Sequence, residues 1–494
     1  MKKFILSVLV FVFLASASVT RAENVGVPAE CEDVMLQAFY WDSYKTQSGT
    51  SSKYGRTKWV DIRKDSVAIC GNFDLVWLPP SAFGDGGEGK GGVGYIPKNF
   101  TDQNSDWGQA TTLDKLIATL HNGGTKVIAD IVINHHGNSN SWCTFYADNF
   151  GKYGSFQLTQ KHICYSDEGF TDSKSSCYQA SVSDRGASDS GTNFEGARDL
   201  DHKNEYVQNW SKAYTKWILG EKKYDGLRYD MTRGYAGQYL SMYNENANPY
   251  ISVSEYWEGI DNTVKHLKET NFNTMIFDFP LKQGSIANGL GKYFNYAILK
   301  SPTNSLRGKG YAKYAVTFID NHDTFERSDN QGGEFYKYNA DLKDATTKRK
   351  IVEANAYILM MPGIPCVFWP HWKSYQYEIN ALIGVRKQAG IHSESAVTEE
   401  IDRTLNTYEA AIQGHKGRII LRMGPNRSKE VPEGYALVLE GGETAQFTIF
   451  FAEGAQGLES AESNRIRGEK FLKDGQLYIR YGEQVYDVLG NKIL

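Results

Sequence analysis

The stretch YDGLRYDMTRGY, residues 224–235, contains the pattern from which the fold can be predicted. Side chains alternate along a β-strand, so a strand here places Arg228 and Asp230 on one face and Tyr229 on the other. A guanidinium beside a carboxylate favours the ionised form and lowers the carboxyl pKa. The pattern therefore predicts an anionic Asp230 at a strand end, suited to a nucleophile or a charge-stabilising group. A structural ion pair is the alternative.

Three further apolar runs also end in polar side chains. They are KVIADIVINHH (126–136), ISVSEYW (251–257) and VTFIDNHD (316–323). In a barrel of parallel strands, the carboxyl ends of the strands converge on one face and supply the active site. Four such runs therefore predict an α/β barrel whose polar groups meet at one face.

Eight apolar runs can be placed as the strands of this barrel. They are residues 34–40, 75–78, 126–133, 226–230, 251–255, 274–279, 314–319 and 366–369. Most neighbours are about 25 to 50 residues apart, which is enough for one strand and one helix. The third and fourth are separated by about 90 residues that are rich in Gly, Ser, Asp and Asn, too many for a single loop. We therefore expect a small domain inserted after the third strand.

The chain resembles the α-amylases of glycoside hydrolase family 13. The matching motifs are DIVINHH (130–136), ARDLDH (197–202), GLRYDMTRGY (226–235), SVSEYW (252–257) and IDNHD (319–323), in the order of the family. Weaker similarity lies in LVWLPPS (75–81), GGVGYIP (91–97) and LMMPGIPCVFWPHW (359–372). The resemblance spans residues 33 to about 390 and is nearest to plant-like and bacterial secreted members, because Gly234 stands where many members have histidine.

The resemblance implies an α/β fold: a TIM (β/α)8 barrel with a small domain inserted after strand 3 and a C-terminal antiparallel β-sandwich. We expect residues 23–136 and 202–397 to form the catalytic barrel, 137–201 the inserted domain and 398–494 the C-terminal domain. The alternating runs RIILRM, YALVLE, FTIFF and LYIRY after residue 397 independently predict an antiparallel β domain.

Residues 1–22 have the features of a secretory signal peptide. Lys2 and Lys3 precede an apolar run, and small residues lead to cleavage points after Ala17 or Ala22. A retained membrane anchor is the alternative, although the 17 uncharged residues from 4 to 20 are at the lower limit for crossing a bilayer. We expect a secreted protein, extracellular or periplasmic, without membrane association after removal of the signal.

Composition agrees with a folded enzyme of this size. The 494 residues are 41% hydrophobic and 23% charged, as in soluble globular proteins. The net charge of −4 and the lack of a basic tract argue against a nucleic-acid partner. We expect a monomer whose partner is an α-glucan polysaccharide or oligosaccharide, as the resemblance implies.

Six cysteines in an exported chain permit disulfides. Cys31 and Cys70 could be bonded to each other, and two of the three residues Cys143, Cys164 and Cys177 are expected to pair. Cys366 lies in an apolar run and is expected to be a buried free thiol. Six free cysteines in a reducing compartment are the alternative. No CxxC pair is present, so no zinc or iron–sulfur site is expected.

Glycoside hydrolysis needs an acid for the leaving oxygen and a second carboxylate at the sugar carbon. The resemblance makes Asp230 the nucleophile, Glu255 the general acid and later base, and Asp323 a carboxylate that binds sugar hydroxyls. The sequence neighbours of Asp230 and Glu255 agree with these roles. Asp230 has Arg228 beside it, whereas Glu255 lies among apolar and aromatic residues with no cationic neighbour in sequence, which should raise its pKa.

The resemblance also implies a set of substrate-binding residues. They are Tyr95, His135, Arg228, Arg233 and His322. Arg233 stands where the family most often has lysine, which keeps the charge but changes the donor pattern. Trp107 and Trp257 are further candidates for stacking on sugars. For His135 and His322 the alternative is a structural histidine whose hydrogen bonds are made within the protein. For Tyr95 the alternative is an aromatic residue packed within a loop.

The resemblance implies a Ca²⁺ cofactor as well. The side chains of Asn134 and Asp199 and the main-chain carbonyl of Gly234 would be its oxygen ligands, of the hard type that suits Ca²⁺. The ion would join the inserted domain to the barrel. Residues 362–372 contain no lysine or arginine to complete a chloride site with Arg228, so chloride dependence is not expected.

These observations predict a secreted, retaining α-amylase that cleaves internal α-1,4 bonds of starch, glycogen and maltooligosaccharides. One alternative is another enzyme of the same family, of the maltogenic or transglycosylase type. A second is a catalytically inactive glycan-binding or membrane-anchored scaffold. The presence of all three acidic residues, Asp230, Glu255 and Asp323, favours an enzyme.

Overall fold

The computed structural model describes residues 24–45, 54–84, 92–300, 302–327, 344–442 and 444–454, and the backbone of 469–473, 476–481 and 484–487. The predicted signal peptide, 1–22, lies outside these residues. The chain divides into two compact units, one that reaches Gly454 and one that starts at Ala455.

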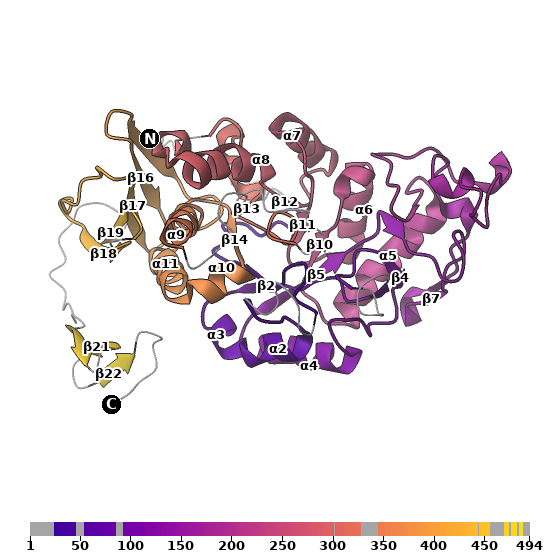
Figure 1. Cartoon of the computed structure of the whole chain (residues 1–494), viewed down its shortest axis with the longest axis horizontal. Coiled ribbons are helices and arrows are strands. Elements are labelled where there is room, and N and C mark those ends of the chain that lie inside the picture. Colours follow the sequence, from indigo (N-terminus) through magenta and orange to yellow (C-terminus); the bar gives the residue numbers. More distant parts are fainter. Residues whose placement is uncertain are drawn as a thin grey trace, which may run out of the picture. The chain divides into compact units, whose positions relative to one another are not determined.

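Eight parallel strands close into a barrel, as the eight apolar runs predict (Figure 1). In chain order they are β1 (Met35–Gln37), β2 (Leu75–Trp77), β5 (Lys126–Ile131), β10 (Gly226–Tyr229), β11 (Ser252–Ser254), β12 (Met275–Phe277), β13 (Ala315–Phe318) and β14 (Ile364–Phe368). Met35 pairs with Leu75 on one side and with Cys366 on the other, which closes the ring. Every strand residue except Lys126 is buried, which explains runs that are continuously apolar rather than alternating.

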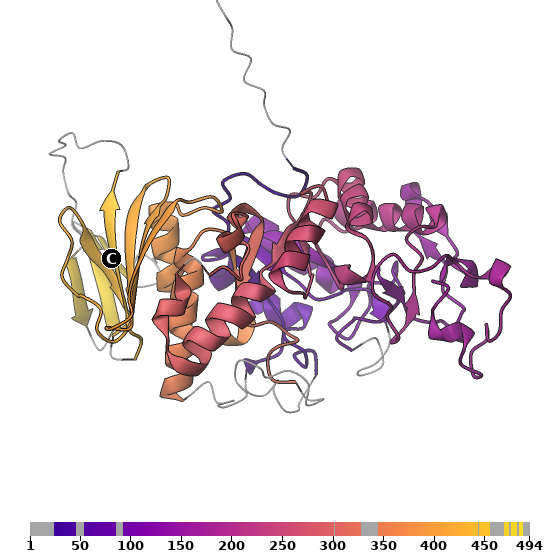
Figure 2. The same ribbon diagram turned by 90° about the horizontal axis from the view of Figure 1, so that it is seen from above.

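Helices cover the outside of the barrel (Figures 1 and 2). They are α2 (Trp59–Lys64), α3 (Ser66–Cys70), α4 (Ala110–Asn122), α5 (Glu205–Gly220), α6 (Gly237–Ala247), α7 (Ile260–Glu269), α8 (Phe279–Leu281) with its wider continuation Lys282–Tyr293, α9 (Ala345–Met360), α10 (Trp369–Ser374) and α11 (Gln376–Ala389). α4 shows why: it buries Leu113, Leu116, Ile117 and Leu120, whose spacing makes one apolar stripe.

Only short elements lie between β5 and α5. β6 (His135–His136) pairs antiparallel with β9 (Arg198–Asp199), and β7 (Asp148–Asn149) pairs with β8 (Ser155–Phe156). Outside this segment, β3 (Phe83–Gly84) pairs antiparallel with β4 (Pro97–Asn99). Because β6 pairs with β9, the two ends of the segment 137–201 meet next to the barrel. Its assignment as a separate domain stays a prediction.

The cysteine expectations are met in part. Cys143 and Cys177 form a disulfide with their Cα atoms 5.9 Å apart, and Cys164 and Cys366 are buried free thiols. The bond considered between Cys31 and Cys70 is wrong, since both residues are free. Cys70 lies at the end of α3 and its thiol points to the carbonyl oxygen of Leu120 on α4, 3.8 Å away.

A five-stranded antiparallel sheet follows the barrel in the first unit. Its order is β15 (Val397–Asp402), β16 (Thr407–Gln413), β17 (Gly417–Met423), β19 (Phe447–Glu453) and β18 (Ala436–Glu440). Burial alternates along β16 and β17, as the sequence pattern predicts. Ion pairs and hydrogen bonds link the sheet to the helical layer. Arg307 contacts Glu399 at 2.9 Å, and Arg349 of α9 donates to Gln446 at 2.6 Å.

The second unit contains a three-stranded antiparallel sheet. Its strands are β20 (Glu469–Lys473), β21 (Gln476–Tyr481) and β22 (Gln484–Asp487), with β21 in the middle. The prediction of antiparallel strands after residue 397 is therefore confirmed in both units. Over the described part of the chain, no helix combines the length and the apolar character that crossing a membrane requires.

Candidate active site

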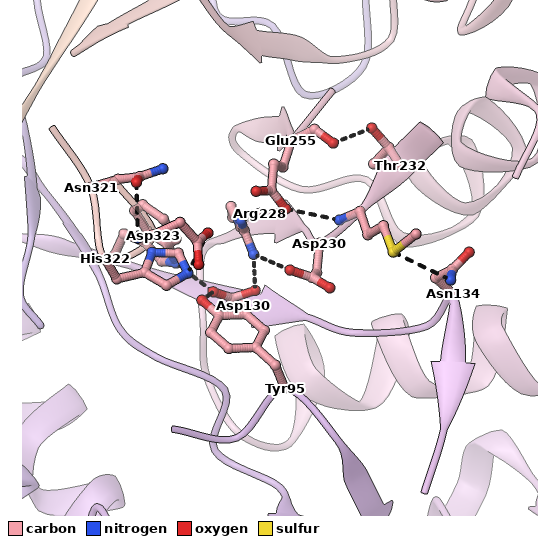
Figure 3. Close-up of polar contacts among 12 residues, drawn as sticks. Tyr95, Asp130, Asn134, Arg228, Asp230, Thr232, Glu255, Asn321, His322 and Asp323 are labelled. Atoms are coloured by element: carbon pink, nitrogen blue, oxygen red, sulfur yellow. Dashed lines mark hydrogen bonds and ion pairs between the residues drawn. The ribbon is translucent and has the colours of Figure 1, made fainter. Parts of the chain in front are cut away.

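The guanidinium of Arg228 lies between three carboxylates (Figure 3). Its Nη1 is 2.8 Å from Asp130 Oδ1 and 2.9 Å from Asp230 Oδ1. Its Nη2 is 2.8 Å from Glu255 Oε2. The three acids follow or belong to β5, β10 and β11, which are neighbours in the barrel. The barrel register therefore brings together charges that are far apart in the sequence.

Glu255 receives a second contact from a strained turn. Met231, directly after Asp230, has a left-handed φ of 43°, which is rare for a residue other than glycine. Its backbone N–H donates to Glu255 Oε2 over 3.0 Å. Thr232 donates its N–H and its hydroxyl to the main-chain oxygen of Glu255, at 2.9 and 2.8 Å. The turn thereby fixes both the backbone and the carboxylate of Glu255.

Asp323 completes the acidic group from the end of β13. Its Oδ2 lies 3.2 Å from His322 Nε2, and its Oδ1 lies 3.0 Å from Arg327 Nη1. His322 in turn accepts a hydrogen bond at Nδ1 from Gln37 Nε2 of β1, at 2.9 Å. Burial and the nearby arginines Arg228 and Arg327 lower the pKa of His322 well below its ordinary value. The neutral ring therefore presents its Nε2–H to Asp323.

The charge balance of the site differs from the sequence prediction. Burial, and next the Glu255 carboxylate, raise the pKa of Asp230 well above its ordinary value, so the predicted lowering is wrong. Glu255 has no cationic neighbour in sequence, but the fold supplies one, because the same Arg228 contacts it. One guanidinium is shared among Asp130, Asp230 and Glu255, and it therefore cannot hold all of them ionised against burial.

A cavity of about 640 Å³ opens over these groups. It is lined by Trp41, Tyr95, Ile96, His135, Phe194, Asp230, Met231, Arg233, Glu255, Trp257, His322 and Asp323. Tyr95, Trp41 and His322 lie in nearly parallel planes; Tyr95 is 5.0 Å from His322 and 6.1 Å from Trp41 between ring centroids. The result is a flat aromatic wall beside carboxylates, the usual surroundings of a bound sugar ring.

Two predicted substrate residues also hold the cavity in shape. Tyr95 donates its hydroxyl to Asp130 Oδ2 over 2.8 Å. His135 Nε2 donates to the main-chain oxygen of Tyr95 over 2.7 Å, and its ring stacks on Phe194 with centroids 4.0 Å apart. Burial lowers the pKa of His135 to about 4, so the ring is neutral at pH 7.

The structure brings seven of the eight predicted catalytic and substrate residues together around the cavity, and the eighth, Arg233, lies at its rim. Its side chain is 43% exposed and its Nη1 is 3.6 Å from Glu258 Oε1. Trp257 lines the cavity and stacks on Phe279. Trp107 is fully buried among Phe39, Tyr44 and Trp59, so the prediction that it stacks on sugars is wrong.

Several residues of the site carry no assignment from the sequence, and four of them have polar or aromatic side chains that shape it. They are Trp41, Asp130, Phe194 and Arg327. Asp130 had a usable signal, since a carboxylate inside an apolar strand is rarely accidental. Trp41 follows the first strand, where active-site residues of a barrel are expected. Phe194 and Arg327 lie in irregular segments, where one aromatic or basic residue gives no such signal.

Beside the cavity, two of the predicted calcium ligands have side-chain oxygens without hydrogen-bond partners. Neither carboxylate oxygen of Asp199 has a hydrogen-bond partner of normal geometry, and Asn134 Oδ1 has none either, although both residues are fully buried. A Cβ on Gly234 would lie 1.9 Å from Asn134 Oδ1, so only glycine can bring its backbone this close. Burial, and next the carboxylate of Asp189, raise the pKa of Asp199 to about 9. Unpaired buried oxygens of this kind fit a hard cation.

Comparison with known proteins agrees with this geometry. Residues 72–371 match the family described as the α-amylase catalytic domain. The chain is 28% identical over 437 residues to "Alpha-amylase 3, chloroplastic" of Arabidopsis thaliana, a match that covers 83% of this chain and 43% of that protein. It is 27% identical over 413 residues to "Probable alpha-amylase 2" of the same plant, which covers 79% of this chain and 88% of that protein. The chain thus spans less than half the length of the first of these relatives.

Solved structures share the fold at lower identity. An Anoxybacillus α-amylase superposes with a TM-score of 0.59 at 16% identity, over 86% of this chain and 99% of that one. A γ-cyclodextrin glucanotransferase of an alkalophilic Bacillus clarkii gives a TM-score of 0.62 at 16% identity, over 88% and 72%. The family match covers more than half of the sequence and includes the strands that hold Asp130, Asp230, Glu255 and Asp323. The chain therefore belongs to the α-amylase family of glycoside hydrolases.

Proposed function

We propose that this protein is an α-amylase that hydrolyses internal α-1,4-glucosidic bonds of starch, glycogen and maltooligosaccharides with retention of configuration. One observation supports this more than any other. Asp230, Glu255 and Asp323 line one cavity, and a single guanidinium contacts the first two. Contact with one small planar group suits the carboxyl separation of about 5 Å in retaining enzymes better than the about 6.5–9.5 Å of inverting ones.

In the first step, Glu255 gives its proton to the glycosidic oxygen while a carboxylate oxygen of Asp230 attacks the anomeric carbon. The carbon–oxygen bond to the leaving chain breaks and a glycosyl ester on Asp230 forms. The division of roles is the one that the family resemblance implies, and Arg228 contacts both acids, so it can stabilise whichever of them carries the negative charge. Three carboxylates share the one guanidinium of Arg228, which favours retaining a proton within this group, and the proposed mechanism places that proton on Glu255.

In the second step, Glu255 takes a proton from a water molecule, and the oxygen of that water attacks the anomeric carbon. The ester to Asp230 breaks, and both acids return to their starting states. Met231 N–H, which donates to Glu255 Oε2 in the free site, keeps this carboxylate directed into the cavity in both steps.

Substrate binding is assigned to the walls of the cavity. Tyr95 and Trp41 offer ring faces to a sugar, and Asp323 and the neutral His322 offer an acceptor and a donor to its hydroxyls. His135 and Arg228 hold Tyr95 and the acids in place as well as bordering the sugar site. Arg233, at the rim, is proposed to contact sugars on the leaving-group side.

The proposed cofactor is Ca²⁺, held by Asn134, Asp199 and the main-chain carbonyl of Gly234. The unpaired oxygens described above support this assignment. When bound, the ion supplies a structural link and no chemistry at the glycosidic bond. Since Asn134 follows β5 and Asp199 belongs to β9, it would join the barrel to the segment 137–201.

Export of the protein is also part of the proposal. The sequence of residues 1–22 supports it, and so does the Cys143–Cys177 disulfide, which is typical of oxidising compartments. We expect the processed chain to act as a monomer without a membrane or nucleic-acid partner.

The assignment can be tested with purified protein and soluble starch. We expect release of reducing ends, a rapid fall in iodine staining that shows internal cleavage, and initial products whose new ends are α-anomers by proton NMR. Asp230→Asn and Glu255→Gln should each lower kcat at least about 1,000-fold. Glu269→Gln, on the exposed face of α7, is the matched control and should leave kcat unchanged. Undiminished activity in either active-site variant would refute the assignment.

A further inference from the structure

A cysteine sulfur lies next to the proposed calcium ligands. Cys164 Sγ and carboxylate oxygens of Asp189 and Asp199 all lie within 4.8 Å of one another. Cys164 and Asp199 are buried, and Asp189 is half-buried. Because Cys143 bonds to Cys177, the thiol of Cys164 is not used in a disulfide. This group was not expected from the sequence, where the three residues are up to 35 positions apart and no CxxC pair occurs.

Within the described parts of the chain, no cationic side chain neutralises the carboxylates of this group. Both oxygens of Asp199 and Oδ2 of Asp189 are buried without a hydrogen-bond partner of normal geometry. Among the described residues, no lysine or arginine forms an ion pair with either carboxylate. Arg198 is occupied by Asp167 and Glu168. Lys203 Nζ donates to Ser188 and to the main-chain oxygen of Asp189, not to its carboxylate.

The backbone fixes the sulfur in this position. Cys164 N–H donates to the main-chain oxygen of Asp199 over 2.8 Å, and Asp167 N–H donates to the oxygen of Cys164 over 3.0 Å. Ile163 and Leu200 form an antiparallel bridge next to this contact. Cys164 and Asp199 are therefore held side by side, and their side chains cannot separate without breaking the pairing.

These observations distinguish two classes of cation. Carboxylate, amide and carbonyl oxygens suit Ca²⁺, whereas thiolate sulfur is a soft ligand that binds Zn²⁺ and Cd²⁺ far better than Ca²⁺. A buried sulfur at the edge of an oxygen site adds nothing for calcium. It adds a strong ligand for a thiophilic ion that also accepts carboxylate oxygens.

We propose that Cys164, Asp189 and Asp199 form a binding site for a thiophilic divalent cation, Zn²⁺ or Cd²⁺, which competes with calcium because Asp199 serves both ions. The inference rests on the proposed calcium site, whose ligand Asp199 it shares. On binding, the Cys164 thiol loses its proton to solvent and its sulfur bonds the metal. Occupancy by such an ion removes Asp199 from calcium and so couples the stability of the segment 137–201 to zinc.

The test uses the full chain freed of metal with a chelator, and Cd²⁺, Zn²⁺ and Ca²⁺ as separate probes. Cd²⁺ should give a sulfur-to-metal charge-transfer absorption in the ultraviolet that saturates at one equivalent and is reversed by excess Zn²⁺. Cys164→Ser should abolish that absorption and weaken Cd²⁺ and Zn²⁺ at least about 100-fold in calorimetric titration, while Ca²⁺ binding changes less than about 5-fold. Cys366→Ser, another buried free thiol, is the matched control and should behave as the unchanged chain.

Three outcomes would overturn the inference. The first is an absent charge-transfer band, and the second is equal Cd²⁺ affinity in Cys164→Ser. The third is a parallel loss of Cd²⁺ and Ca²⁺ in Cys164→Ser, which would show a structural role rather than ligation. Asp199→Asn separates this inference from the calcium proposal. Loss of both ions in Asp199→Asn supports the shared ligand, whereas a chain that gives the sulfur band but never binds Ca²⁺ refutes calcium alone.

Discussion

Arg228 Nη2 lies 2.8 Å from Glu255 Oε2, while Nη1 of the same guanidinium lies 2.9 Å from Asp230 Oδ1. The two acids to which the proposed mechanism assigns the chemistry are thus connected through one buried cation. When a proton leaves Glu255, the charge that appears is already faced by Nη2, and when Asp230 forms its ester, Nη1 still has Asp130 as a partner. In the proposed mechanism, the arrangement would keep the ionic environment nearly constant through both steps of hydrolysis.

Arg228→Lys should therefore reduce activity although it keeps the charge. A single ammonium cannot reproduce the two-nitrogen fork that reaches Asp130, Asp230 and Glu255 at once. We expect kcat on maltooligosaccharides to fall at least about 100-fold, with a smaller change in KM. Arg418→Lys, at an exposed position of β17, is the control and should leave kcat unchanged. If kcat of Arg228→Lys stays within about 3-fold of the parent value, the two-nitrogen fork is dispensable.

Asp323→Asn should stabilise the protein, and more so at higher pH. Burial, and next Glu255, raise the pKa of Asp323 from 3.8 to about 7. Between pH 4 and 7 the folded state holds a proton that the unfolded chain has released, so the stability contribution falls as the pH rises through this window. Above pH 7 the buried charge costs the folded state its full penalty. Asparagine removes that penalty, and we expect a gain of about 1–4 kcal/mol at pH 8 and almost none at pH 4.

Urea unfolding of Asp323→Asn and the parent protein at pH 4, 6 and 8 measures this dependence. Asp114→Asn, an exposed acid on α4, provides the control and should show no trend. A gain that is the same at all three pH values would mean that the charge of Asp323 carries no penalty. Activity of Asp323→Asn at pH 8 should be lost, because the sugar hydroxyls lose their charged acceptor.

Removal of the disulfide should weaken the segment 137–201. The Cys143–Cys177 bond closes a loop of 34 residues, which corresponds to about 3–4 kcal/mol of loop-closure free energy. We expect Cys143→Ser to unfold at a lower temperature than the parent, and dithiothreitol to lower the midpoint of the parent but not of the variant. Cys366→Ser, which removes an unbonded thiol, should respond to the reductant like the parent.

Calcium removal should destabilise the protein before it affects the chemistry. We expect the protein to unfold at a lower temperature in EDTA than in a sample with calcium, because the ion binds the folded state. The difference should grow with the calcium concentration of that sample. Asp199→Asn should unfold at the same temperature with and without EDTA. Asp172→Asn, a half-buried acid in the same segment that is not a proposed ligand, should keep the full response. If EDTA leaves the unfolding temperature of the parent unchanged, the calcium proposal fails.

The sequence by itself determined the barrel and the identity of its acids. Continuous apolar runs mark strands that are buried on both faces, and the polar residues that end them, such as Asp230, Glu255 and Asp323, must collect at the carboxyl ends of parallel strands. These are local patterns, because a strand alternates over a few residues and its end is marked by the change from apolar to polar side chains. The antiparallel strands after residue 397 could be predicted from their short alternating runs for the same reason.

Only the tertiary structure decided how the charges balance and which neighbours share them. Arg228 is two residues from Asp230 in sequence but equally close to Asp130 and Glu255 in space, so the pKa of Asp230 is raised where the local pattern predicts a lowered one. Trp107 became a core residue, and Cys164 came to lie beside Asp189 and Asp199. Electrostatic energies depend on distance and burial, and both are set by contacts between distant segments that no local pattern contains.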